Sequence, residues 1–183
     1  LAEKNGDTIS TAANTKFADI PAHAWYSGYV KYLSNNGITY GKSKTIFAPN
    51  DAITRAEFTT MAVRFFDVYG DGDAEIMEQF SGFNDVSSGY WAAEYIKYAA
   101  LHGWINGYGD GSFHAEREIN RAEVVTIVNR LLGREADEDY IADNLRKLNT
   151  FPDVSRKHWA YYAVMEAANA HTAVLGENES WSK

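Results

Sequence analysis

Two arginines at the start of predicted helices are the residues of this chain best suited to hold a ligand. Arg55 lies in the motif Ile-Thr-Arg-Ala-Glu at 53–57, and Arg121 lies in Ile-Asn-Arg-Ala-Glu at 119–123. The first backbone N–H groups of a helix have no partner inside that helix, and a guanidinium beside them adds a planar, charged donor. Together they can bind an anion. We therefore predict an anion-binding site at each arginine.

The residues beside each arginine predict a capped helix start. Thr54 and Asn120 can serve as N-caps, and Glu57 and Glu123 then stand three positions later, which is the spacing of a capping box. An apolar pattern with helical spacing follows each motif. The two glutamates should therefore bond to the backbone at the helix start, and this makes them poor candidates for catalytic carboxylates.

The sequence does not indicate an enzyme. A glycoside hydrolase would need two carboxylates about 5–9.5 Å apart across a sugar cleft, and no pair of residues stands out for this role. Asp71, Asp73 and Asp110 lack the acidic spacing and the final Glu of a calcium-binding EF-hand loop. The histidines show no spacing typical of metal ligands. We expect no catalytic residue, no metal and no cofactor.

An internal repeat organises the chain. The motif Phe-x-Asp followed by Ile or Val begins at positions 17, 83 and 151, and a tryptophan follows each Asp by six residues, at Trp25, Trp91 and Trp159. Each complete copy has the pattern of helix, loop and helix, and Gly37 or Gly103 stands where the first helix should end. At this spacing the tryptophans are expected to start helices and to face the core, although a sugar-stacking role is the alternative.

The repeat also predicts the domain organisation, which is an arm or linker followed by two complete repeats and one incomplete repeat, joined by connecting segments. We assign 1–16 to a linker or disordered arm, 17–66 to repeat 1, 67–82 to a connecting segment, 83–132 to repeat 2, 133–150 to a second connecting segment and 151–183 to an incomplete repeat 3. Acidic patterns at 73–79 and 137–148 predict short helices in the two connecting segments.

Composition limits the class of protein and its partners. Of the 183 residues 45% are hydrophobic and 14% aromatic, so the chain can bury a core. There is no cysteine, which excludes disulfides and thiolate metal sites. The net charge of −8 argues against nucleic acid and anionic membranes as the main partners. No apolar run reaches the roughly 18–20 residues needed for membrane insertion.

These motifs resemble the S-layer homology domain, a family that typically occurs as three tandem copies. The resemblance rests on Phe-x-Asp-Ile/Val, the tryptophan after it, Gly-Tyr-Gly-Asp-Gly-Ser-Phe at 107–113 and Ile-Thr-Arg-Ala-Glu at 53–57. It implies an all-α fold, in which three helix-loop-helix repeats form a pseudo-threefold assembly around a central helical bundle. It also implies a secreted protein at the bacterial cell wall or S-layer surface, which attaches to a secondary cell wall polysaccharide that often carries pyruvate ketals.

The resemblance further implies that the ligand binds in grooves between successive repeats. In this chain the expected ligand-binding residues are Arg55, Arg121, Asp85, Asp153, Gly109, Asp110, Ser112, Trp91 and Trp159. The aspartates that open the repeats have a simpler alternative role as helix-entry caps. Because repeat 3 has no Arg-Ala-Glu motif, we expect at most two competent sites, with the tail and Trp181 over the third surface.

Two binding functions remain open. The preferred one is a monomeric module, fused to a larger surface protein, that anchors its cargo to the cell wall polysaccharide. The alternative is a structural module whose main role is self-association in a surface lattice.

Overall fold

The structure is a computed structural model and describes residues 8–69, 80–174 and 180–182. Over these residues the regular secondary structure is helical except for one short hairpin and one isolated bridge, and loops connect the helices, so the predicted all-α class is confirmed. None of the helices in these ranges is long and apolar enough to cross a membrane. The elements in chain order are α1 (Ser27–Asn35), α2 (Arg55–Tyr69), α3 (Ala93–Leu101), α4 (Arg121–Leu131), α5 (Glu138–Asn144), the 3₁₀-helix η2 (Leu145–Lys147), α6 (Tyr161–Ala168), β1 (Thr172–Val174) and β2 (Ser180–Ser182).

The long helices α2 and α4 begin with the predicted capping boxes. The Thr54 hydroxyl accepts from the Glu57 N–H at 3.2 Å, and the Glu57 carboxylate accepts from the Thr54 N–H at 2.9 Å. Asn120 and Glu123 make the same reciprocal pair, with both bonds at 3.0 Å. These contacts involve residues three positions apart, so the local sequence is sufficient to set both helix starts.

The three repeat tryptophans do not face the core, and this expectation was wrong. Trp25, Trp91 and Trp159 are 75%, 56% and 65% exposed. Each stands in a turn two residues before its helix begins. The buried side chains of α3 are the smaller Ile96, Ala99 and Ala100, and small side chains allow closer packing between helices. Gly37 and Gly103 do end α1 and α3 as predicted, with φ of 72° and 68°.

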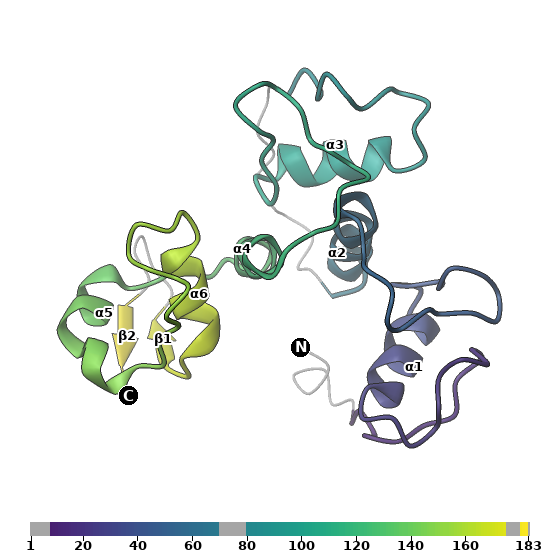
Figure 1. Ribbon diagram of the computed structural model, residues 1–183, viewed down its shortest axis with the longest axis horizontal. Coiled ribbons are helices and arrows are strands. Elements are labelled where there is room, and N and C mark those ends of the chain that lie inside the picture. The colour runs from purple at the N-terminus through teal and green to yellow at the C-terminus, as the bar shows by residue number, and fades with distance from the viewer. Residues whose placement is uncertain (1–7, 70–79, 175–179, 183) are drawn as a thin grey trace.

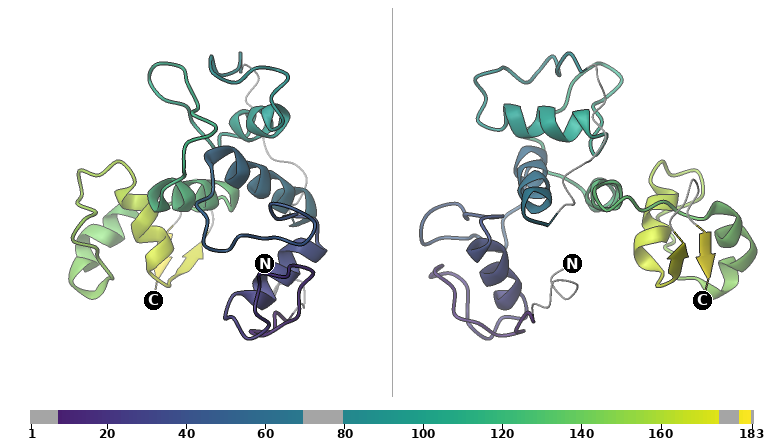
Figure 2. Two further views of the ribbon diagram at one scale, coloured as in Figure 1. Left: turned by 45° about the vertical axis from the view of Figure 1, so that its right-hand side comes forward. Right: turned by 180° about the vertical axis from the view of Figure 1, so that it is seen from behind.

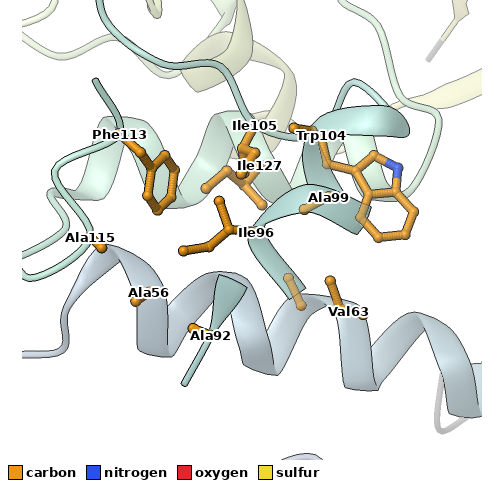
Figure 3. Close-up of a cluster of buried hydrophobic side chains, with 12 residues drawn as sticks. Ala56, Val63, Ala92, Ile96, Ala99, Trp104, Ile105, Phe113, Ala115 and Ile127 are labelled. Atoms are coloured by element: carbon orange, nitrogen blue, oxygen red, sulfur yellow. The ribbon is translucent and has the colours of Figure 1, made fainter. Parts of the chain in front are cut away.

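Successive repeats are joined by helix packing. The first helix of a repeat packs on the second helix of the repeat before it, so α3 lies on α2 and α6 lies on α4, and α2 and α4 also contact each other. Figure 3 shows the main core, in which Ile96 and Phe113 of repeat 2 pack with Ala56 and Val63 of α2. Its buried members are Ala56, Ala62, Val63, Ala92, Ile96, Ala99, Ala100, Trp104, Ile105, Phe113, Ala115 and Ile127.

Three lobes surround the two long helices (Figure 1). One lobe carries α1, the second carries α3, and the third carries α5, α6 and the hairpin, while α2 and α4 lie between them. The views in Figure 2 show the same separation of the lobes. Within the described residues the third repeat contributes no long central helix. The pseudo-threefold arrangement and the predicted domain boundaries therefore stay predictions.

The third lobe has its own core and a hairpin that was not predicted. The acidic pattern at 137–148 forms α5 and η2 as predicted, whereas the pattern at 73–79 lies outside the described residues, as does part of the 1–16 arm. β1 pairs with β2 in antiparallel register, Ala173 opposite Trp181. Trp181 is 6% exposed and stacks on His171 with ring centroids 3.9 Å apart. It packs in the core of its own lobe, with Ile141, Tyr161 and Met165.

Candidate functional site

The start of α2 is docked on the second repeat. The Arg55 N–H donates to the Arg117 carbonyl and the Ala56 N–H to the Ala115 carbonyl, both at 2.9 Å. Thr54 forms an isolated antiparallel bridge with Glu118. Backbone N–H groups that the sequence analysis assigned to an anion are therefore paired with the neighbouring repeat. At Arg55 any anion must be bound by side chains.

The Arg55 side chain crosses into repeat 2 and is only 5% exposed. Its Nε donates to the Phe113 carbonyl at 2.8 Å, one terminal nitrogen donates to Glu123 Oε1 at 2.8 Å, and the other donates to the Asn106 carbonyl at 3.2 Å. The guanidinium carbon lies 4.4 Å from the ring centroid of Phe113 and 5.2 Å from that of Tyr108. Arg55 thus links the two repeats and forms part of the wall of a groove.

Glu123 is the only acidic residue that lines this groove in the part of the chain the structure describes. Burial on its own would raise the pKa of Glu123. The Asn120 N–H, the Tyr108 hydroxyl and the charges of Arg55 and Arg117 outweigh it and hold the pKa below its usual range. Burial lowers the pKa of Arg55, and Glu123 opposes that change. An arginine starts from so high a pKa that it stays charged near neutral pH.

The groove beside Arg55, which we name the repeat-2 groove, has a volume of about 750 Å³. Three arginines and two tryptophans line it, and one of the tryptophans, Trp159, comes from the third repeat. Its residues are Arg55, Trp104, Ile105, Asn106, Gly107, Tyr108, His114, Arg117, Asn120, Glu123, Thr126, Ile127, Arg130 and Trp159. This arrangement presents guanidinium groups and an exposed indole to one ligand, which suits an acidic sugar.

A second groove, which we name the repeat-1 groove, stands at the equivalent place in repeat 1 and has a volume of about 280 Å³. Here Trp91 takes the place of Trp159, because it comes from the repeat that follows. The polar lining residues include Tyr40, Lys42, Asp51, Glu57 and Arg64. Among the described residues the arginine that lines this groove is Arg64, on α2 of repeat 1 itself.

Comparison with known proteins identifies the repeats. Residues 16–59 and 82–125 match the family model of the S-layer homology domain. The chain carries S-layer homology domains. The family expected from the motifs is thus confirmed, and its model matches the two complete repeats.

The relatives of this S-layer homology chain are much longer proteins. It is 31% identical over 181 residues to Cell surface glycoprotein 1 of Acetivibrio thermocellus, covering 94% of this chain and 7% of the relative. It is 29% identical over 164 residues to the Cellulosome-anchoring protein of the same bacterium, covering 88% and 34%. It is 29% identical over 131 residues to the Surface-layer 125 kDa protein of Lysinibacillus sphaericus, covering 70% and 11%. The chain thus spans about a third or less of each relative.

The predicted arginines have different surroundings in the two S-layer homology repeats. Arg55 and Trp159 meet in the repeat-2 groove, and Trp91 lines the repeat-1 groove. Arg121 is exposed at the first turn of α4 and lines neither groove. The segment that receives Arg55 is the loop of the next repeat, whereas the described residues that follow α6 in the third repeat form β1 and β2. Ligand binding by Arg121 stays a prediction.

The aspartates that open the complete repeats hold loops rather than cap helices. Asp85 accepts from the N–H groups of Phe113 and His114, both at 2.7 Å. Asp19 accepts from Phe47 and Ala48 in the same way. Burial would raise the pKa of Asp85, but the two N–H groups outweigh it and the pKa falls. The helix-cap alternative is therefore wrong for these two residues.

The remaining predicted residues lie away from the repeat-2 groove. Asp110 accepts from the Ser112 N–H at 3.0 Å and from its hydroxyl at 2.6 Å, which closes the turn that contains Gly109. Asp153 is exposed, and the described residues after α6 form β1 and β2 instead of a loop like the one that Asp85 holds. None of these residues lines either groove. Their contact with a ligand stays a prediction.

Sequence reasoning missed several groove residues. Arg130 stands on α4 at the position that Arg64 has on α2, so comparing the repeats could have found it. The counterpart of Arg117 in repeat 1 is Asp51, so comparing the two repeats does not indicate an arginine at this position. Tyr108 belongs to the motif at 107–113 but was not among the expected ligand-binding residues; its hydroxyl donates to Glu123 at 3.0 Å. Tertiary contacts were needed to bring these three together.

Proposed function

We propose that this module anchors a larger bacterial surface protein to the cell wall, without a covalent bond, by binding a secondary cell wall polysaccharide that carries pyruvate ketals. The module is secreted, acts at the cell wall or S-layer surface, and performs no catalysis. The names of two relatives, a cellulosome-anchoring protein and a surface-layer protein, support this role. The observation that carries the proposal is the repeat-2 groove, where three arginines and the exposed Trp159 surround one glutamate.

The groove residues divide the recognition of a ketal sugar between charge and stacking. Arg117 and Arg130 are exposed. One terminal nitrogen of Arg117 contacts Glu123 and Tyr108, and its other guanidinium N–H groups, with those of Arg130, can donate to the ketal carboxylate. Trp159 offers an apolar face to the C–H groups of the sugar ring. Arg55 lies behind them, where its bond to Glu123 fixes its position.

The expected affinity is moderate. A hydrogen bond to a charged group contributes about 1.5–3 kcal/mol. Two such bonds and a stacked indole are consistent with a Kd near micromolar, or about 8 kcal/mol. The overall charge of −8 does not prevent this, because the positive lining is local to the groove. Anchoring of a large cargo would gain further from repeated binding along one polysaccharide.

The test is sedimentation of the module with purified cell walls, before and after the secondary polysaccharide is removed. We expect binding to be lost from stripped walls. The double variant Arg117→Gln, Arg130→Gln should weaken binding to intact walls by at least about tenfold, since two charge-assisted contacts are lost. The double variant Arg146→Gln, Arg156→Gln is the charge-matched control, because both arginines are exposed and lie outside both grooves. Circular dichroism melts establish that all variants fold.

The lattice function predicts a different outcome of the same experiment. Binding that is unchanged on stripped walls, together with concentration-dependent association of the module in sedimentation velocity, would contradict polysaccharide anchoring. It would favour self-association instead.

A further inference from the structure

We propose that the two grooves recognise different sugars of the polysaccharide, an acidic residue in the repeat-2 groove and a neutral residue in the repeat-1 groove. This inference rests on the proposed function and assigns a ligand class to each groove. Its basis is that equivalent positions in the two grooves carry different charges.

The repeat-2 groove has an excess of positive charge. Arg55, Arg117 and Arg130 line it with Glu123 as the opposing acid, which gives three positive charges against one negative. Glu123 contacts both Arg55 and Arg117. The net lining charge of +2 is thus available to stabilise a carboxylate.

The repeat-1 groove is electrically balanced. Lys42 and Arg64 line it together with Asp51 and Glu57, which gives two charges of each sign. Lys42 Nζ lies 2.5 Å from Glu57 Oε1, so this cation is already paired. A carboxylate entering the groove would meet Asp51 and Glu57 without a net positive charge to offset them.

Aromatic groups dominate what the repeat-1 groove can offer a ligand. Tyr40 is 57% exposed and Trp91 is 56% exposed, and both line the groove. The Arg64 guanidinium carbon lies 4.7 Å from the ring centroid of Tyr40 and 5.0 Å from that of Tyr95, so it is held between two rings. Stacking surfaces with balanced charge suit an uncharged pyranose ring.

Two features of this chain cause the difference. The repeat-2 groove is lined by Arg55 from repeat 1 in addition to its own arginines, whereas among the described residues the arginine that lines the repeat-1 groove is Arg64, from repeat 1 itself. The position of Arg117 is occupied by Asp51 in repeat 1, which reverses the charge there. A single substitution can therefore test the idea by making the repeat-1 groove resemble its neighbour.

The experiment follows the indole N–H signals of the whole module by ¹⁵N NMR, with Trp91 reporting the repeat-1 groove and Trp159 the repeat-2 groove. The probes are methyl β-D-glucopyranoside and its 4,6-O-(1-carboxyethylidene) ketal. We expect the ketal to shift Trp159 with an affinity about tenfold tighter than the parent sugar, and about 0.5 M salt to remove this gain. The parent sugar and the ketal should shift Trp91 with similar affinities.

Asp51→Arg should raise the ketal affinity at Trp91 about five- to tenfold, because it replaces a negative charge with a positive one. Asp143→Arg is the control, since it makes the same charge change on α5, where Asp143 is exposed and outside both grooves. Equal ketal affinities at both tryptophans, or no gain in Asp51→Arg, would overturn the division between grooves. A module that also fails to bind the intact polysaccharide would instead overturn the proposed function.

Discussion

At the scale of single residues, the two motif arginines show how one sequence pattern acquires two roles. Both stand at the first position of a capped helix. Arg55 is 5% exposed and reaches Glu123, Phe113 and Asn106, whereas Arg121 is exposed. The difference lies outside the motif, in the presence or absence of a following loop.

This contrast predicts unequal effects on stability. Arg55→Ala should lower the free energy of unfolding by about 2–3 kcal/mol, because the buried carboxylate of Glu123 and two carbonyls lose a donor. This loss is smaller than the full cost of removing one partner of a buried ion pair, because Arg117 still contacts Glu123 in the variant. Arg121→Ala should change stability by less than about 0.5 kcal/mol, as is usual for exposed sites. Urea unfolding measures both, and equal midpoints for the two variants would contradict the buried role of Arg55.

At the scale of elements, the loops between the paired helices are held by the aspartates that open the complete repeats. Asp85 binds two successive N–H groups of the loop at 106–118, and Asp19 does so in repeat 1. The loop of repeat 2 in turn supplies much of the repeat-2 groove. Asp85 therefore positions groove residues without lining that groove itself.

Asp85→Ala should lower the free energy of unfolding by about 1–2 kcal/mol, because two charge-assisted bonds are lost from a partly exposed carboxylate. Asp153→Ala is the matched control, because Asp153 is exposed and the described residues after α6 form β1 and β2 instead of such a loop; it should change stability by less than about 0.5 kcal/mol. If Asp153→Ala destabilised the protein as much as Asp85→Ala does, the effect of Asp85 would not come from its bonds to the loop.

The same contribution should depend on pH in a defined direction. The folded protein lowers the pKa of Asp85 below its unfolded value near 3.8. Its stabilising effect is therefore complete above that value and is lost as the pH falls through the lower, folded pKa. The stability difference between wild type and Asp85→Ala should be constant from about pH 5 to 7 and should shrink at about pH 3 and below. A stability difference between wild type and Asp85→Ala that grows as the pH falls would contradict this prediction.

At the scale of the whole molecule, the repeats are not independent units. The main core draws on α2 of repeat 1 and on α3 and the loop of repeat 2, while the third lobe has a separate cluster around Ile141, Tyr161 and Met165. Stability should therefore be shared between repeats 1 and 2 and be partly separate in the third lobe.

Two core truncations test this division. Ile96→Ala, at 1% exposure in the shared core, should cost about 2–4 kcal/mol and weaken amide hydrogen-exchange protection in α2 as well as α3. Ile141→Ala, also 1% exposed, should cost a similar amount but should act mainly on α5 and α6. Protection lost only within α3 in the first variant would mean that the repeats unfold separately.

The sequence by itself determined the features that depend on contacts along a short stretch of chain. The capping boxes at Thr54 and Asn120 and the glycine stops at Gly37 and Gly103 involve partners within a few positions, so local residue types are sufficient to specify them. The repeat and the family follow from motifs that recur along the chain, which are also read directly from the sequence.

Only the tertiary structure decided which side chains meet across repeats. The three tryptophans are exposed in the turns before their helices, and Arg55 is buried because the next repeat places Phe113 and Glu123 around it. The positive charge of the repeat-2 groove is likewise a sum over residues from separate repeats. Such contacts join positions more than fifty residues apart, and local pattern carries no information on which neighbour will be present.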